Sequence, residues 1–267
     1  MRLWVSASSV PLAACTLLFP LDDQRALPER LGTEGGVVGP DASRVDADNR
    51  PDAAFSCGGR TALLCVDFDD AGFTQTPETN GTGALSVETT NARSAPRSLA
   101  FFLPGVAPNV TPVPPSARGW VMVPVAGDHP VVRIAFDVRV ETPPRVTGAN
   151  DVNLVTLRYG QRYFYVFRSD VGLTVGESVF PDAGRVNVNH PSIPRPLVLD
   201  RWTHLELAVN LQSKTSSFSI DGDVVEANYR LQPDWTTGAL VVTLGTEFTP
   251  RAVGDLRVRW DNFLLTE

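Results

Sequence analysis

Residues 131–140 read VVRIAFDVRV, and apolar side chains recur at every second position of this stretch. The recurring apolar positions are Val132, Ile134, Phe136, Val138 and Val140. Successive side chains of a β-strand point to opposite faces, so this period predicts a strand with one face in a core and the other in solvent. Residues 203–211, THLELAVNL, alternate in the same way.

Turn residues around these stretches extend the β pattern to most of the chain. Asp221-Gly222 separates two β-rich runs, and glycine supplies the positive φ that tight hairpin turns require. The candidate strands are 61–68, 85–89, 98–103, 120–123, 131–140, 153–159, 163–168, 172–175, 197–198, 203–211, 216–220, 223–227, 240–245 and 256–265. So many half-buried strands need two stacked sheets. We therefore expect an all-β, two-sheet antiparallel β-sandwich over residues 57–267.

Residues 22–56 differ in composition and are expected to form a flexible acidic linker. They contain eight acidic residues and four arginines, and no sustained apolar period. Arg2 and residues 57–267 account for the rest of the net charge of −7, so the domain has no general basic field. Binding to nucleic acid is therefore not expected.

The N-terminal 21 residues are expected to direct export. Arg2 precedes a mostly apolar run that ends in Leu12-Ala13-Ala14-Cys15. These four residues resemble the bacterial lipobox, in which the cysteine becomes the first mature residue and is acylated. The resemblance implies a lipoprotein anchored to the bacterial cell envelope through Cys15. The alternatives are an ordinary cleaved signal peptide, which gives a secreted protein, and an uncleaved anchor that reaches Leu21.

Cys57 and Cys65 remain as an even pair once Cys15 is set aside. In an exported protein such a pair predicts a disulfide, and Gly58-Gly59 would let the chain reverse between the two cysteines. The bond would hold the start of the first strand. A metal site or a redox pair is less favoured, because no further ligands stand at zinc spacing and the motif is not Cys-x-x-Cys.

The C-terminal half resembles a known superfamily. Residues 201–207 (RWTHLEL), 218–222 (FSIDG) and 260–263 (WDNF) resemble the concanavalin A-like, laminin-G-like lectin/glucanase jelly roll, and residues 65–69 (CVDFD) and 94–99 (SAPRSL) fit its N-terminal half. The resemblance covers about residues 60–267. It implies that the last strand closes beside the first, and the superfamily includes sugar-binding modules, glycoside hydrolases, polysaccharide lyases and adhesive modules.

Catalytic motifs of these enzymes are not found in the sequence. Glu206 has no acidic partner two residues away on its strand face, and the arginine, histidine and tyrosine elements of alginate lyases are missing. His129, His190 and His204 are scattered, and the first two precede prolines and are expected in loops. We therefore expect a protein that is not an enzyme.

One hypothesis places a calcium site where the first and last strands meet. Asp67, Asp69, Asp261 and Asn262 would supply the hard oxygen ligands that Ca²⁺ prefers. The alternative, favoured because Ca²⁺ needs six or more oxygens, is that these side chains hold strand ends in place.

A glycan surface is the second hypothesis. Arg133 with Arg139 and Arg257 with Arg259 share strand faces, and Arg158 flanks a run that contains Tyr163. Arginine forks recognise carboxylates, and aromatic rings stack on sugars. Trp120 and Trp235, near turns, could add aromatic platforms. The alternative is cross-strand ion pairing with Asp137 and Glu141.

The combined expectation is a non-catalytic, exported and envelope-anchored module that binds a polysaccharide or glycoconjugate. The alternatives are a glycan-active hydrolase or lyase with an unrecognised site, and a purely structural or protein-adhesive surface module. The only cofactor considered is Ca²⁺.

Overall fold

The computed structural model describes residues 55, 57, 61–69, 78–80, 83–105, 117–142, 152–168, 172–179, 186–232, 235–249 and 255–267. The predicted signal segment with Cys15 and, apart from Phe55, the predicted linker lie outside these residues. Every regular element in the described part is a β-strand. It contains no helix long and apolar enough to cross a membrane.

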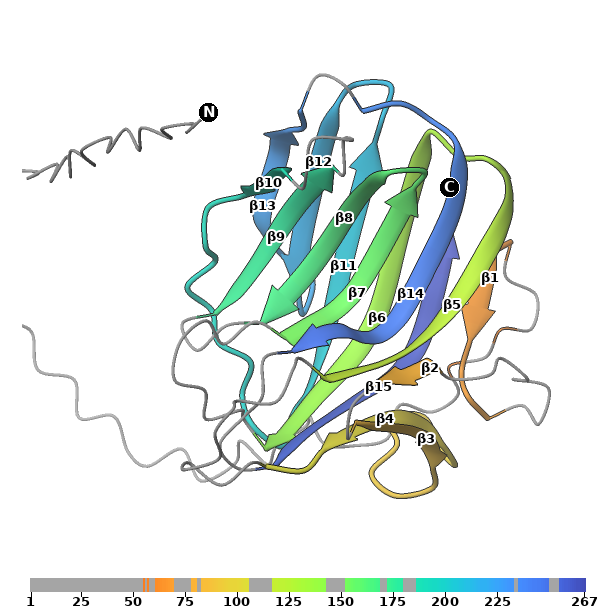
Figure 1. Ribbon diagram of the computed structural model, residues 1–267, viewed down its shortest axis with the longest axis vertical. Helices are drawn as coiled ribbons and strands as arrows, with labels where there is room; N and C mark the ends of the chain where they lie inside the picture. Colours follow the sequence, from red (N-terminus) through yellow and green to blue (C-terminus); the bar gives the residue numbers. More distant parts are fainter. Residues whose placement is uncertain are drawn as a thin grey trace, which may run out of the picture. The chain divides into compact units, whose positions relative to one another are not determined.

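One layer of the molecule is an antiparallel sheet, sheet A, with the strand order β13-β12-β11-β6-β15-β4-β3 (Figure 1). A further strand, β1, pairs with β15 beside this path. The strands are β1 (Leu64–Val66), β3 (Ala84–Glu88), β4 (Ser98–Leu103), β6 (Val131–Thr142), β11 (Trp202–Asn210), β12 (Thr215–Ile220), β13 (Asp223–Arg230) and β15 (Leu256–Thr266).

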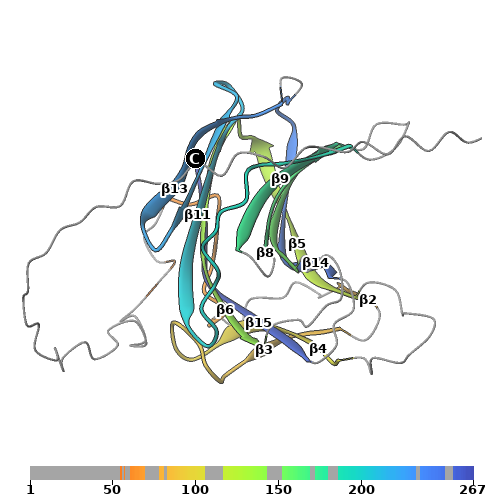
Figure 2. The same cartoon turned by 90° about the vertical axis from the view of Figure 1, so that its left-hand side faces the viewer.

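The second layer, sheet B, is also antiparallel and has the order β10-β9-β8-β7-β14-β5-β2. Its strands are β2 (Glu78–Asn80), β5 (Ala117–Asp128), β7 (Val152–Tyr159), β8 (Arg162–Arg168), β9 (Leu173–Val179), β10 (Val186–Asn189) and β14 (Ala239–Thr249). The two sheets face each other as layers of a sandwich, and sheet B is bent so that its outer face lies on the inside of the bend (Figure 2). The predicted two-sheet antiparallel β-sandwich is confirmed.

The alternation in β6 creates one side of the core. All five of its predicted apolar positions are fully buried, whereas Arg133 between them is exposed. Phe136 packs against Phe263 of the neighbouring strand with ring centroids 6.2 Å apart. Trp260 also lies in the core, and its indole N–H donates to the carbonyl of Leu154 in sheet B at 2.8 Å, so the last strand is tied to both layers.

The hairpin and the disulfide form as the sequence predicts. Asp221-Gly222 joins β12 to β13, and both residues have positive φ, 52° and 84°. Cys57 and Cys65 form a disulfide with a Cα–Cα distance of 5.6 Å. Cys65 stands opposite Leu264 in the antiparallel β1–β15 pair, so the first strand does lie beside the last.

Candidate functional site

The outer face of sheet B gathers the side chains best suited to hold a ligand. In β8, Phe164 and Val166 point into the core, and Tyr163, Tyr165 and Phe167 alternate to the opposite side. The register of the sheet extends this face into three rows of side chains. We call the residues of these three rows the sheet B face. The first row contains Asn187, Ser178, Tyr163, Arg158, Val241 and Pro124, and the second contains Asn189, Gly176, Tyr165, Thr156, Thr243 and Met122. The third row contains Thr174, Phe167, Asn153, Gly245 and Trp120.

The composition of the sheet B face is aromatic and polar with a single charge. Arg158 is the one charged residue among those named, and Glu78 of β2 stands opposite Trp120 at the end of the third row. Amides from β10 and β7 and hydroxyls from β9, β7 and β14 surround the aromatic rings. A face of this kind can stack on apolar surfaces of a ligand, form hydrogen bonds and attract one negative charge.

Contacts within the face hold the aromatic rings in place. The rings of Tyr165 and Phe167 have centroids 5.6 Å apart. The hydroxyl of Tyr165 donates to Oδ1 of Asn189 at 3.3 Å, so β8 is linked to the edge strand β10. Gly176 makes room for this arrangement, because a Cβ at that position would lie 2.4 Å from Cε2 of Tyr165.

Arg158 and Tyr163 form the charged end of the face. The guanidinium carbon of Arg158 lies 5.5 Å from the centroid of the Tyr163 ring, a cation–π distance, and Nε donates to the carbonyl of Gly160 at 2.9 Å. Both side chains, and that of Trp120, are partly exposed, whereas Tyr165 and Phe167 are buried. Three of the predicted glycan-binding residues, Arg158, Tyr163 and Trp120, therefore share one face.

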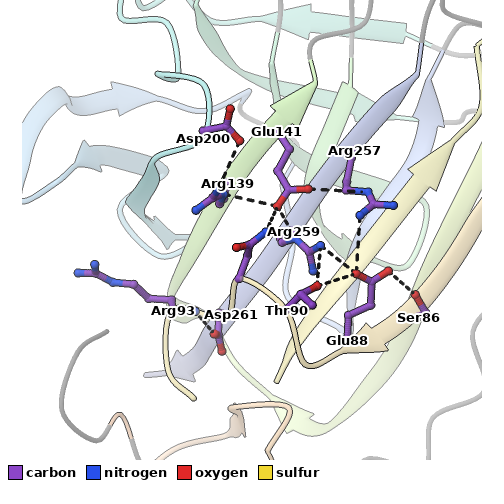
Figure 3. Close-up of polar contacts among 11 residues, drawn as sticks. Ser86, Glu88, Thr90, Arg93, Arg139, Glu141, Asp200, Arg257, Arg259 and Asp261 are labelled. Atoms are coloured by element: carbon purple, nitrogen blue, oxygen red, sulfur yellow. Dashed lines mark hydrogen bonds and ion pairs between the residues drawn. The ribbon is translucent and has the colours of Figure 1, made fainter. Parts of the chain in front are cut away.

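The remaining four predicted arginines lie on the other side of the sandwich. Arg133, Arg139, Arg257 and Arg259 alternate to the outer face of sheet A, where they meet acidic side chains. Figure 3 shows these contacts for Arg139, Arg257 and Arg259. Arg133 contacts Glu206 at 2.8 Å, and Arg139 contacts Asp200 at 3.3 Å. The structure thus separates the predicted set between two opposite faces.

Arg259 shows what the arginines of sheet A do. Its side chain is fully buried; Nε donates to Glu141 at 2.6 Å and Nη2 to Glu88 at 2.8 Å. Desolvation alone would raise the pKa of Glu88, but hydrogen bonding and attraction from Arg259, with a contribution from Arg257, hold it below its usual value. These contacts are the cross-strand ion pairs of the alternative hypothesis.

Trp235 is a correction to the predicted glycan surface. Its side chain has no exposed area, and its indole N–H donates to Oε2 of Glu177 inside the molecule. The Trp235 ring packs at 5.8 Å from Phe164 and 6.0 Å from Tyr159. Proximity to a turn suggested exposure, but the hydrogen-bonded indole instead fills the core and cannot act as an exposed platform.

The residues of the predicted calcium site hold loops in place. Asp261 Oδ2 accepts the backbone N–H groups of Arg93 and Ser94 at 2.8 and 3.0 Å, and Asp69 Oδ1 accepts that of Arg97 at 2.8 Å. Asp67 Oδ1 accepts the N–H of Asp69. Among the described residues no group of three or more His, Cys, Asp or Glu side chains is arranged to hold a metal ion.

The row of polar groups around Asp261 continues across sheet A. Asn262 donates to Asp137 Oδ2 at 2.6 Å, and His204 Nδ1 lies 3.0 Å from Oδ1 of the same carboxylate. Burial raises the pKa of Asp261 to about 7, against the opposing effect of the N–H groups that it accepts. The side chain of His204 is about half exposed, at 46%.

His190 belongs to a buried polar cluster that sequence reasoning missed. It follows β10 directly, but its side chain is fully buried, with Nε2 3.1 Å from Glu177 and Nδ1 2.9 Å from Glu226. Tyr229 stacks on the imidazole at a centroid distance of 3.4 Å. Glu177, Glu226 and Tyr229 lie 13, 36 and 39 residues from His190 along the chain, so no local motif indicates the cluster.

Comparisons with known proteins address the fold. No protein-family model matches the chain, and no well-characterised protein matches it by sequence. Among solved structures, the endo-β-1,4-glucuronan lyase of the fungus Trichoderma reesei is 13% identical, with a TM-score of 0.60 over 77% of this chain and 95% of that one. The cellulose induced protein Cip1 is 15% identical, with a TM-score of 0.51 over 76% and 96%. The chain shares their jelly-roll β-sandwich fold.

Proposed function

We propose that this protein is a non-catalytic module that binds an acidic polysaccharide on the sheet B face. The observation that carries the proposal is the run of aromatic residues Tyr163, Tyr165 and Phe167 at alternate positions of β8, with Arg158 beside it. A polymer of sugar rings presents the apolar faces, hydroxyls and carboxylates that such a set recognises.

Each group has a part in this binding. Arg158 pairs with a carboxylate of the polymer, a charge-assisted contact worth about 1.5–3 kcal/mol. Exposed Tyr163 and Trp120 supply stacking surfaces, and the amides of Asn187 and Asn189 bond to sugar hydroxyls. Tyr165 and Phe167 are more buried and support the rings that touch the ligand.

The comparisons agree with this class of ligand. The glucuronan lyase that shares the fold is named for a polymer of uronic acid, and Cip1 is named for its induction by cellulose. The fold likeness alone leaves the reaction open. The positive charge of Arg158 is the reason for proposing a polymer that carries carboxylates.

A lyase acting at the same face is the second candidate. The specific observation in its favour is the adjacency of Arg158 and Tyr163, at 5.5 Å. Elimination from a uronate needs a cation that neutralises the carboxylate and a base that removes the neighbouring carbon-bound proton, and a phenolate beside a guanidinium can meet both needs. The C–O glycosidic bond breaks as the C=C bond forms, and the departing oxygen takes a proton from the phenol or from water and leaves as a hydroxyl. Both candidates share the ligand and differ in whether the polymer is cut.

One experiment separates the candidates. The full chain is run in native gels that contain neutral or uronate polysaccharides, and the same mixtures are assayed for unsaturated chain ends by ultraviolet absorbance. Retardation by uronate polymers without product supports binding alone, and formation of product supports the lyase. If neither retardation nor product is seen, a structural or protein-adhesive module is the remaining explanation.

A matched pair of variants locates the site. Arg158→Ala should weaken retardation at least tenfold, because the face loses the guanidinium beside Tyr163. Arg133→Ala removes an exposed arginine from the opposite side of the sandwich and should leave retardation unchanged. The reverse result would move the binding site to sheet A.

We also propose that Cys15 is acylated and holds the protein at the bacterial cell envelope. The support is the lipobox-like LAAC sequence at residues 12–15. Two acyl chains would give stable anchoring, at about 0.8 kcal/mol for each buried methylene. A Cys15→Ser variant should move from the membrane fraction to the soluble exported fraction, and continued sedimentation with membranes would contradict acylation.

A further inference from the structure

A pocket at the edge of the sandwich lies apart from the sheet B rows. It has a volume of about 450 Å³ and lies between residues 191–195, which follow β10, and strand β13. Its lining residues are Pro191, Ser192, Ile193, Pro194, Arg195, Val225, Glu226, Ala227 and Tyr229. The walls are therefore mostly apolar, with one aromatic ring and a few polar groups.

Tyr229 is a fixed platform in this pocket. One face of its ring stacks on His190, with centroids 3.4 Å apart and planes 20° apart. His190 cannot rotate away without breaking its contacts with Glu177 and Glu226. Because His190 covers one face, the pocket meets the other side of a ring whose position is already set, and a ligand would not have to order it.

The charges of the pocket exclude anions. Glu226 uses Oε1 to accept from His190, and it forms no other hydrogen bond in the described part of the chain, which leaves Oε2 as an acceptor. Arg195 at the rim is already paired with Asp223 at 2.9 Å. A ligand that carries a carboxylate would meet Glu226 with no uncommitted cation to offset the repulsion.

The Tyr229 ring offers a cation little additional attraction. Both ring nitrogens of His190 face carboxylate oxygens, so both must carry protons to form their hydrogen bonds. The resulting imidazolium stacks on one face of the Tyr229 ring. The ring therefore already has a cation–π partner. What remains is an uncharged ligand that has an apolar face and hydroxyl donors.

We propose that this pocket binds a pyranose ring that carries no charge, stacked on Tyr229 with a hydroxyl donating to Glu226. The site is distinct from the sheet B face and does not depend on the function proposed for it. The pocket should reject anionic ligands, which the sheet B face should prefer, because the pocket contains the carboxylate of Glu226 and the sheet B face contains Arg158. The protein would then hold an acidic polymer and a neutral sugar at two separate places.

The test uses NMR of the full chain labelled with ¹⁵N. Neutral gluco-, manno- and xylo-oligosaccharides at millimolar concentration should shift the backbone amide signals of Ser192, Ile193, Ala227 and Tyr229 with at least one member of the panel. Oligouronates and amino-sugar oligomers should leave these signals unchanged. Absence of shifts with every neutral member, or shifts with a charged oligomer, would overturn the proposal.

Three variants make the test specific. Ala227→Trp fills the pocket without altering the contacts of His190 and should abolish the shifts at residues 192 and 193. Tyr229→Ala removes the platform and should weaken binding at least tenfold. Val224→Ala is the matched control, because Val224 is 66% exposed on the same strand and is not a lining residue.

The outcome is independent of the sheet B face. Tyr163→Ala should reduce retardation by uronate polymers and leave the shifts at the pocket intact, and Ala227→Trp should do the opposite. Persistence of the shifts at residues 192 and 193 in Ala227→Trp would show that the sugar binds elsewhere and would overturn the proposal, whatever the result with uronates.

Discussion

Nδ1 of His190 lies 2.9 Å from Oε1 of Glu226, and this contact joins the two sheets at one open edge of the sandwich. His190 directly follows β10, the edge strand of sheet B, and Glu226 belongs to β13, the edge strand of sheet A (Figure 1). On the other side, Nε2 contacts Glu177 of β9 at 3.1 Å. One side chain therefore links the edge strands of the two sheets.

Replacing His190 should cost much of the stability of the fold. His190→Ala leaves two carboxylates buried without their shared cation, and breaking a buried pair in this way costs about 3–5 kcal/mol. His204→Ala is the control, because His204 also contacts an aspartate but is about half exposed, and it should cost roughly 1 kcal/mol or less. Urea unfolding measures both, and equal losses would contradict a special role for the buried histidine.

The same cluster should make stability depend on pH. Desolvation alone would lower the pKa of His190, but the hydrogen bonds to Glu177 and Glu226 outweigh it and raise the pKa above 6.5. The stability that this group adds is fully present below pH 6.5, its unfolded value, and is lost as the pH rises through the folded pKa. The difference in melting temperature between the wild type and His190→Ala should therefore shrink as the pH is raised. A constant difference would show that His190 does not change protonation in this range.

The free energy of unfolding should also depend on pH through Asp261, and Asp261→Asn should remove this dependence. Burial raises its pKa from 3.8 to about 7, so its contribution to stability is full below 3.8 and falls as the pH rises towards 7. The free energy of unfolding of the wild type, relative to Asp261→Asn, should decline over that range and then level off. A relative increase instead would mean that the hydrogen bonds from Arg93, Ser94 and Asn262 outweigh burial.

Arg259 and Arg133 should differ sharply although both pair with glutamate on sheet A. Arg259 is fully buried between Glu141 and Glu88, so Arg259→Met should destabilise by about 3–5 kcal/mol. The side chain of Arg133 is 58% exposed, and Arg133→Met should change stability by less than about 1 kcal/mol. Chemical denaturation tests the contrast, and a small effect at Arg259 would mean that methionine packs as well as the ion pairs.

Gly176→Ala should act on binding more than on folding. The new Cβ would lie 2.4 Å from Cε2 of Tyr165, and the end of that ring must move away, which disturbs its hydrogen bond to Asn189. We expect several-fold weaker retardation by uronate polymers. Gly238→Ala, where nothing lies within 4 Å of the added atom, should bind as the wild type does. Unchanged binding in Gly176→Ala would remove Tyr165 from the site.

Strands could be predicted from local patterns, because alternation is a property of neighbouring residues. Val132 to Val140 and Leu205 to Val209 entered the core as their period indicated. Residues 197–198 were expected to form a strand and do not, although Leu197 is buried. Pro194 and Pro196 stand beside them, and proline removes the N–H donors that a strand needs.

The site could be predicted only in part, because it depends on the pairing of distant strands. Tyr159, Tyr163 and Tyr165 look alike in sequence, yet the β7–β8 turn leaves Tyr159 in the core, 3% exposed, and the other two on the outer face. The arginines of β6 and β15 were correctly grouped by strand, but nothing local showed that they lie across the sandwich from Arg158. Cross-strand register decides such questions.

The pairing of Cys65 with Leu264 also determines how the domain would bear a mechanical load. A pull on the chain ahead of Cys57 passes through the disulfide directly to Cys65. From there it reaches β15 as shear along the β1–β15 hydrogen bonds, which run between antiparallel strands at the two ends of the folded chain. If Cys15 tethers the protein to a membrane and the sheet B face holds a polymer, tension between them meets a covalent link first and an inner strand of sheet A next.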